Sequence, residues 1–385
     1  MDLQLSEEQQ ARRLEARDWL GDNVPAERMP SMDTVSGKSA HQAWEKRLAD
    51  GRWSVVQWPA EFGGRDYGIV DWLLFEEEYH AAGGPTRINH NGLTLLGATL
   101  LEHGTREQAR RILPAMVNGD QIWAQAWSEP GAGSDLASVT CRAEPVEGGF
   151  RLAGQKIWSS RAAVADRGFG LFRSGPGKGH RDLTYLMFDL EADGVEVRPI
   201  RRIDGDPVFA EIFFDGLFVP DADVIGERGA GWSVAMSTAS KERGINLRSP
   251  GRFLAVVSRL LELWRALPLG WQEVHAERVQ DVWTRTQAYR LQGFAAAVDD
   301  GPATHASIGK PFWSELDIAL HEAGLAVVAD LRAAERPTFA PDDIEAEEST
   351  WRQGLLFALA GPIYAGTNEI QRSIVAERLL GLPRG

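Results

Sequence analysis

The sequence predicts a mostly helical α+β protein in which one block of short strands separates two blocks of helices. Apolar residues recur every three to four positions up to about residue 120, and long amphipathic patterns return near the end of the chain. Between them lie short segments rich in β-branched and aromatic residues, divided by turn signals. Helices and strands that do not alternate favour segregated layers. We therefore expect an N-terminal helical domain over 1–120, a central β-barrel or sandwich domain over 121–227 and a C-terminal helical bundle over 228–385.

The N-terminal block carries four amphipathic helical patterns, and glycine and proline punctuate them, as in WPAEFGGRDYG at 58–68. The helical patterns cover residues 39–53, 71–83, 90–104 and 106–119. The strand patterns cover residues 121–127, 138–146, 149–158, 183–190, 195–201 and 210–219. The later helical patterns cover residues 252–267, 275–298, 314–334 and 370–381.

Composition excludes several classes of function. The chain has 385 residues and a net charge of −14, so it is a poor candidate for binding nucleic acid or an anionic membrane. No apolar run approaches the roughly 20 residues that span a bilayer, and the N-terminus lacks an apolar signal core. The single Cys141 permits no internal disulfide, which is typical of a reducing compartment. We expect a cytoplasmic protein.

No metal or dinucleotide motif stands out. The eight histidines are scattered without HExxH spacing, and the one cysteine has no second thiol to share a metal, so we expect no metal site. No GxGxxG leads from a strand into a helix, which argues against a Rossmann fold. The stretch WSEPGAGSDLAS at 127–138 is different, because its glycines expose backbone N–H groups and its serines add hydroxyls. Such a surface suits a flavin edge or an amide-rich ligand, whereas the plain alternative is a polar turn.

Five stretches, in order along the chain, resemble the signatures of acyl-CoA dehydrogenases. They are WPAEFGG (58–64), WSEPGAGSDLAS (127–138), LAGQKIWSS (152–160), FAEIFFDGLFVPDADVIGERGAGW (209–232) and IYAGTNEIQRSIVAERLLGLPR (363–384). The resemblance implies N-terminal helices, a central β-domain and a C-terminal four-helix bundle, with FAD between β-domain and bundle. It also implies α,β-dehydrogenation of an acyl-CoA or acyl-carrier-protein thioester. In that reaction a carboxylate takes the α-proton and the β-hydride passes to flavin N5.

The resemblance also assigns binding positions. Those expected to bind FAD are Gln125, Trp127, Ser128, Trp158, Ser160, Thr367 and Glu369. Trp158 would lie against the dimethylbenzene side of the flavin, and Trp127 is larger than the usual residue at its place, which would narrow the adjoining pocket. Ser134 would contact the pantetheine arm of the substrate. The alternative for each aromatic residue is ordinary core packing.

The expected catalytic base is not at its usual place. Most members of the family carry a glutamate where this chain has Ala365, although the backbone N–H of Ala365 can still serve the oxyanion hole. Isovaleryl- and long-chain-type members instead place their glutamate on a bundle helix, immediately before an arginine. Glu242 and Arg243 match that pair, so we expect Glu242 to be the base, with apolar surroundings raising its pKa, and Arg243 to bind substrate. The alternative is a solvated or Arg-paired glutamate.

Two FAD-contacting elements that most members share, Arg-x-Gln-Phe-Gly and Gln-x-x-Gly-Gly-x-Gly, are absent from this sequence. Two other functions therefore stay open. One is a catalytically silent partner subunit of a heteromeric acyl-CoA dehydrogenase. The other is a flavin-dependent oxygenase or oxidase of specialised metabolism. For the dehydrogenase we expect electron-transfer flavoprotein or oxygen as the electron acceptor, and a dimer or tetramer of like or unlike subunits.

Overall fold

The computed structural model describes residues 4–243, 248–298, 304–334 and 339–383, without the side chains of Val35, Lys241, Glu242, Arg243, Thr304 and His305. Helices come first, strands follow and helices return, which confirms the predicted fold class. The helices before the sheet are α1 (Glu7–Asn23), α2 (Val35–Asp50), η1 (Ala60–Phe62), α3 (Ile69–Ala81), η2 (Asn91–Gly97), α4 (Ala98–His103) and α5 (Arg106–Val117).

The strands occupy the middle of the chain, and long helices follow them. The strands are β1 (Trp123–Ala126), β2 (Arg142–Val146), β3 (Gly149–Ser160), β4 (Arg167–Arg173), β5 (Leu183–Asp189), β6 (Val195–Ile200), β7 (Phe209–Pro220) and β8 (Val224–Ile225), with short turns η3 (Leu136–Ser138) and η4 (Asp221–Asp223). The later helices are α6 (Gly231–Arg243), α7 (Pro250–Arg265), α8 (Leu269–Val298), α9 (Thr304–Ala333), α10 (Pro341–Ala358), α11 (Asn368–Ile374) and η5 (Val375–Leu379). No helix within these described ranges has the length and apolar content that crossing a membrane requires.

Side-chain caps define where several helices begin. At α1, the Ser6 hydroxyl accepts a hydrogen bond from the backbone N–H of Gln9, and Oε1 of Gln9 accepts one from the backbone N–H of Ser6. Thr105 and Gln108 form the same reciprocal pair at α5. These boxes satisfy N–H groups that the first helical turn leaves without partners.

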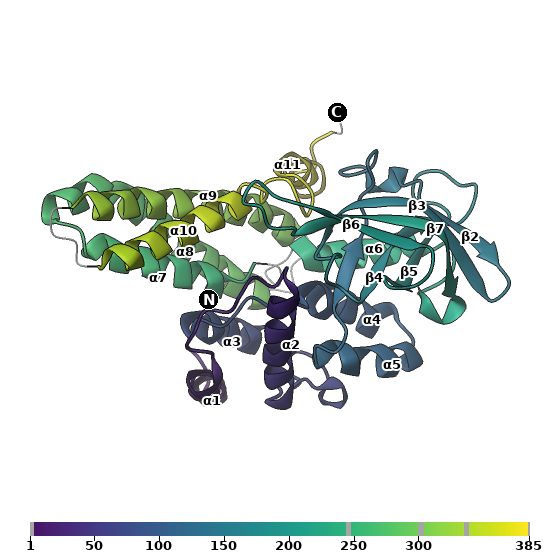
Figure 1. Cartoon of the computed structure of the whole chain (residues 1–385), viewed down its shortest axis with the longest axis horizontal. Helices are drawn as coiled ribbons and strands as arrows, with labels where there is room; N and C mark the ends of the chain where they lie inside the picture. The colour runs from purple at the N-terminus through teal and green to yellow at the C-terminus, as the bar shows by residue number, and fades with distance from the viewer. Residues whose placement is uncertain (1–3, 244–247, 299–303, 335–338, 384–385) are drawn as a thin grey trace. The chain divides into compact units, whose positions relative to one another are not determined.

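The chain folds into two compact units. Unit 1 comprises Met1–Val24, Gly68–Gly84 and Arg243–Gly385, and unit 2 comprises Pro25–Tyr67 and Pro85–Glu242. In unit 1 the long helices α7 to α10 lie side by side as a bundle, and α3 packs against α1 and α7 (Figure 1). Its core is apolar and includes Phe253, Leu260, Trp313, Leu320 and Trp351.

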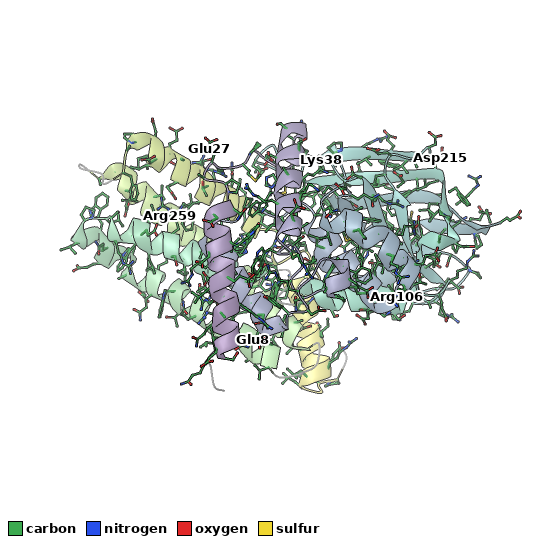
Figure 2. All side chains as sticks on the ribbon, turned by 90° about the horizontal axis from the view of Figure 1, so that it is seen from below. Glu8, Glu27, Lys38, Arg106, Asp215 and Arg259 are labelled. Carbon is green, nitrogen blue, oxygen red and sulfur yellow. The ribbon has the colours of Figure 1, made fainter. Side chains whose placement is uncertain are left out.

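Ion pairs join helices at the surface of the bundle. Arg259 on α7, labelled in Figure 2, donates from Nε to Glu347 Oε1 on α10 at 2.9 Å. Arg259 also pairs with Glu262 one turn further along its own helix, with 2.8 Å between Nη1 and Oε2. Because these groups are half-exposed, we expect each pair to add less than about 1 kcal/mol to stability.

Unit 2 is built on one sheet with the strand order β6-β7-β3-β2-β4-β5-β8, of which Figure 1 labels β2 to β7. Strand β1 pairs in parallel with β4. Alternation along β5 sends Tyr185 and Met187 into one core and Leu186 and Phe188 into another, so the sheet is buried on both faces at this strand. The first core also contains residues of α5 and α6, including Leu113 and Ala235. The end of β1 therefore lies beside β4, a strand whose side chains are buried on both faces of the sheet.

Candidate functional site

The turn that follows β1 is held by a buried ion pair. The Nζ of Lys156, on β3, lies 2.9 Å from Oε1 of Glu129 and also donates to the carbonyls of Trp127 (3.1 Å) and Leu171 (2.7 Å). Lys156 is fully buried and Glu129 nearly so. The second oxygen of Glu129 accepts from the backbone N–H of Thr140. All the donor capacity of this buried ammonium is therefore used, as such a group requires.

The ionisation state of this pair follows from the same contacts. Burial alone would raise the pKa of Glu129, but the charge and hydrogen bond of Lys156, together with the backbone donors, lower that pKa overall. Burial raises the pKa of the neighbouring Cys141 thiol to about 12, so this residue is a neutral thiol at physiological pH. The turn thus contains a charged pair and no reactive thiolate.

Trp158 is the most exposed of the predicted flavin-facing residues. It lies in an irregularity of the β3–β7 pairing between Lys156 and Ser159, with a left-handed backbone at φ 60°. Its side chain is 57% exposed and stands edge-on to Phe209, with ring centroids 5.9 Å apart. An exposed indole on a backbone conformation that a bulky residue seldom adopts is a feature of ligand sites.

The other residues predicted to face the flavin surround this indole. The N–H of Ile157 donates to the carbonyl of Ser128 at 2.9 Å, which joins the turn after β1 to the strand that carries Trp158. Gln125 lies on β1, and its side-chain Nε2 is buried without a hydrogen-bond partner among the described residues. Ser160 ends β3, opposite Phe209. The structure therefore brings Gln125, Trp127, Ser128, Trp158 and Ser160 to neighbouring strands and turns of unit 2.

Trp127 is fixed in orientation. Its indole Nε1 donates to the hydroxyl of Tyr185 at 3.2 Å, and that hydroxyl donates to Oγ1 of Thr238 on α6 at 3.3 Å. Tyr185 and Thr238 are fully buried. By helical periodicity, position 242 lies one turn after Thr238 on the same face of α6. The indole is thereby linked to the helix that carries the predicted base.

Ser134 lies on the exposed loop between β1 and β2. Glu129 and Ala132 close the start of this loop with two backbone hydrogen bonds of 2.9 and 3.0 Å. Arg173 holds its far side by donating from Nη2 to the carbonyl of Ala137 at 2.8 Å. The loop that carries the Ser134 hydroxyl is therefore held by hydrogen bonds on both sides.

In unit 1, the loop between α10 and α11 has an unusual backbone. Ala365 and Gly366 are both left-handed, with φ of 55° and 77°. This conformation costs an L-residue about 1–2 kcal/mol, so the surrounding contacts must hold Ala365 in place. Among the described residues no hydrogen bond joins the Ala365 N–H to an acceptor, whereas its carbonyl accepts from the side chain of Gln371.

The two remaining predicted contacts follow that loop. Thr367 is the N-cap of α11, and its hydroxyl accepts from the N–H of Ile370 at 3.3 Å. Glu369 is exposed, and its pKa is lowered because its carboxylate accepts from its own backbone N–H and from the Thr367 hydroxyl. The structure brings Ala365, Thr367 and Glu369 together at the start of α11.

The predicted base and its neighbour fall at the end of α6. The backbones of Glu242 and Arg243 are helical, but their side chains lie outside the described part of the chain. The assignment of Glu242 as base therefore stays a prediction. Four residues that support the site were not singled out from sequence: Lys156, Tyr185, Thr238 and Gln371. For Lys156 a signal existed, since a lysine on the inward side of an apolar strand must find a buried partner.

The arrangement on β1 and β3 fits the isoalloxazine of a flavin. Trp158 offers an exposed aromatic face, and the buried Nε2 of Gln125 is a donor without an acceptor, which an electronegative ring atom or carbonyl could satisfy. Thr367 and Glu369 offer hydroxyl and carboxylate oxygens that suit ribose or adenine donors. Among the described residues no group of three or more His, Cys, Asp or Glu side chains could hold a metal ion.

Comparison with known proteins identifies the family of the chain. Residues 6–120 match the family description "Acyl-CoA dehydrogenase, N-terminal domain", residues 124–217 the middle domain and residues 229–380 the C-terminal domain. Acyl-CoA dehydrogenase IpdE1 of Mycobacterium tuberculosis is 38% identical over 386 residues, covering 97% of both chains.

Two solved structures are similar over almost the whole chain. The Tcur3481–Tcur3483 steroid ACAD superposes with a TM-score of 0.87 at 26% identity and covers 100% of both chains. An FAD complex of PigA superposes with a TM-score of 0.80 at 24% identity, over 99% of this chain and 100% of that one, which shows the shared fold.

Proposed function

Because this chain belongs to the acyl-CoA dehydrogenase family, whose members are FAD-dependent oxidoreductases, we propose that it dehydrogenates an acyl thioester between the α- and β-carbons. The observation that carries this proposal is the left-handed backbone of Ala365, whose N–H has no acceptor among the described residues. An N–H held in this way is a donor for the oxygen of a thioester as that oxygen gains negative charge.

In this proposal the reaction begins with loss of an α-proton. Thioester α-protons are weak acids, so the Ala365 N–H would stabilise the developing enolate while Glu242 accepts the proton. Thr238, one turn earlier on α6, is tied through Tyr185 to Trp127, which supports a rigid position for residue 242. When bound, FAD supplies the acceptor for the hydride that leaves the β-carbon.

Substrate recognition is assigned to the loop after β1. Ser134 would contact the pantetheine arm, which coenzyme A and carrier proteins share, and Arg243 would help to bind the substrate. The fixed indole of Trp127 would form one wall of the acyl pocket and limit the shape of the acyl group. IpdE1 is named an acyl-CoA dehydrogenase, which supports coenzyme A as the carrier.

We also propose that the chain works in an oligomer. The C-terminal segment exposes several large apolar side chains, which favours burial against another subunit. They are Leu359, Ile363, Ile370, Leu379, Leu380 and Leu382. The similar steroid ACAD carries a name that joins two components, which supports an unlike subunit as the partner. Sedimentation at micromolar concentration tests the oligomer. A chain that sediments as a monomer, both alone and together with an unlike subunit, would contradict the proposal.

One alternative function is favoured by a specific observation. Alanine at position 365 removes the carboxylate from the family's usual loop, which a catalytically silent subunit would also tolerate. Such a subunit would complete the site of a second chain and would not itself oxidise a thioester.

One experiment separates these functions. The purified chain is tested for bound FAD and then mixed anaerobically with a series of acyl-CoA and acyl-carrier-protein thioesters. We expect a yellow protein that loses its oxidised flavin absorption and releases an enoyl thioester. A chain that is colourless alone and takes up no FAD would contradict a dehydrogenase made of this chain alone, whereas loss of oxidised flavin absorption by the chain alone would contradict the silent subunit. Oxygen incorporated into the product under air would favour an oxygenase.

A further inference from the structure

The buried side-chain amide of Gln371 bonds the left-handed loop before α11. Nε2 of Gln371 donates to the carbonyl of Ala365 at 3.1 Å and approaches the carbonyl of Gly366 at 3.5 Å. Gln371 is fully buried. A single side chain one turn into α11 therefore bonds the residue whose backbone is strained.

The orientation of this amide is fixed by what it faces. Two carbonyl oxygens require a donor, so the Nε2 end must point toward the loop. The opposite atom, Oε1, is buried and has no partner among the described residues, which is unfavourable for an amide oxygen. The hydrogen bonds that this side chain makes are therefore those of its Nε2 to the loop.

The loop is also held at both ends by side chains that bond its flanking residues. Before it, Nη2 of Arg248 donates to the hydroxyl of Tyr364 at 2.7 Å. After it, Oδ1 of Asn368 accepts from Nζ of Lys310 at 2.9 Å and from Oγ of Ser314 at 3.1 Å. Lys310 and Ser314 are fully buried. Between these fixed ends, the side-chain hydrogen bond that reaches Ala365 itself comes from Gln371.

We propose that Gln371 is a positioning residue for the oxyanion site: by bonding the carbonyl of Ala365 it holds this residue left-handed, so that its N–H points at the thioester oxygen. The inference rests on the proposed function, since it assigns Gln371 to the enolate-stabilising step of that reaction. Gln371 touches neither substrate nor cofactor in this account and acts only through the backbone of the loop.

The test measures the acidity of a bound α-proton rather than turnover. A 3-ketoacyl-CoA, whose enolate absorbs in the ultraviolet, is titrated with pH on the holoenzyme, with its partner subunit where one is required. Binding to the wild-type protein should lower the apparent pKa of the probe relative to free solution. Gln371→Met, which keeps length and volume but cannot donate, should reduce the ratio of enolate to neutral probe by about tenfold or more.

Two comparisons separate positioning from general destabilisation. The affinity for a saturated acyl-CoA, which carries no enolate charge, should change by less than about threefold in Gln371→Met. Gln108 provides a matched control, since it is also buried and its Nε2 donates to two carbonyls, those of Ala222 (3.0 Å) and Val224 (2.6 Å). Gln108→Met should lower thermal stability without changing the acidity of the bound probe.

The outcomes are distinct. An unchanged probe pKa in Gln371→Met, beside a wild-type protein that does acidify the probe, overturns the role of Gln371 and leaves the proposed function intact. A wild-type protein that binds the probe without acidifying it overturns the proposed function, and the inference with it. Should Gln371→Met fail to fold, Gln371→Asn, whose amide is too short to reach both carbonyls, is carried through the same titration with the same expected loss.

Discussion

Lys156 Nζ and Glu129 Oε1 lie 2.9 Å apart with both side chains buried, and the same Nζ bonds the carbonyl of Trp127. The pair therefore stabilises the turn that carries two of the residues predicted to contact the flavin. Both charges have lost their hydration, so each depends on the other for its stability.

Breaking this pair should be costly. Lys156→Met leaves the carboxylate of Glu129 buried without its cation, so we expect a loss of about 3–5 kcal/mol in the free energy of unfolding. Chemical denaturation of the whole chain, followed by a probe in the sheet of unit 2, measures this free energy. Lys178→Met, at an exposed lysine of the same unit, is the control and should change stability by less than about 0.5 kcal/mol. A loss below about 1 kcal/mol in Lys156→Met would contradict the role assigned to the pair.

The exposed indole of Trp158 should matter for cofactor binding and little for folding. Because 57% of its surface is exposed, Trp158→Ala should leave the stability of the protein without FAD nearly unchanged. It should weaken FAD binding by about tenfold, the value of one lost aromatic contact. Isothermal titration of the FAD-depleted protein with FAD measures the affinity, and denaturation of the same protein without FAD measures the stability. Trp283→Ala, at a 44% exposed tryptophan of α8, is the control and should bind FAD normally. An equal loss of FAD affinity in both variants would contradict the assignment of Trp158 to the flavin site.

Acid should destabilise the bundle through Asp317. Burial raises the pKa of this carboxyl, but Arg252, whose Nη1 lies 2.8 Å from Oδ2, and His321, whose Nδ1 lies 3.2 Å from Oδ1, outweigh it and hold the pKa well below its ordinary value. A carboxyl with a lowered folded pKa stabilises the protein above its unfolded pKa of about 3.9, and this contribution is lost as pH falls further.

Asp317→Asn therefore has a defined signature. It should lower stability near pH 7 by about 3 kcal/mol, because Arg252 loses its partner, and should flatten the decline of stability below about pH 4. Denaturant midpoints measured from pH 2 to 7 in wild type and variant provide the check. Parallel curves for the two proteins would show that Asp317 does not carry the acid dependence.

The order of the architecture could be predicted from the sequence because periodicity is local. Apolar residues spaced by three or four predict the helices. Strand β5 is instead a short apolar run, and its Tyr185 and Leu186 point into two different cores. Motif context also led to Trp158, whose exposure a propensity argument would not give. The pairing of β1 with β4 depends on tertiary contacts, as does the Lys156–Glu129 bond across 27 positions.

The resemblance predicts which residues form the candidate site, whereas the side chains that support them are seen only in the structure. Ala365 was expected to offer an N–H, yet nothing in a run of small residues indicates a left-handed alanine or the glutamine that bonds it. Tyr185 and Thr238 likewise act through side-chain contacts between distant segments. Such contacts become visible only when the chain is folded.

The central claim is that Glu242 takes the α-proton although the usual loop position holds alanine. Anaerobic stopped-flow reduction of the bound flavin by an acyl-CoA tests it in wild type, Glu242→Gln and the double variant Glu242→Gln with Ala365→Glu. We predict that Glu242→Gln keeps fold, flavin and thioester binding but reduces its flavin about 10²–10⁴-fold more slowly, because an amide cannot accept the proton. The double variant should recover part of this rate through the restored loop carboxylate. Near-native reduction by Glu242→Gln would contradict the account and place the base elsewhere.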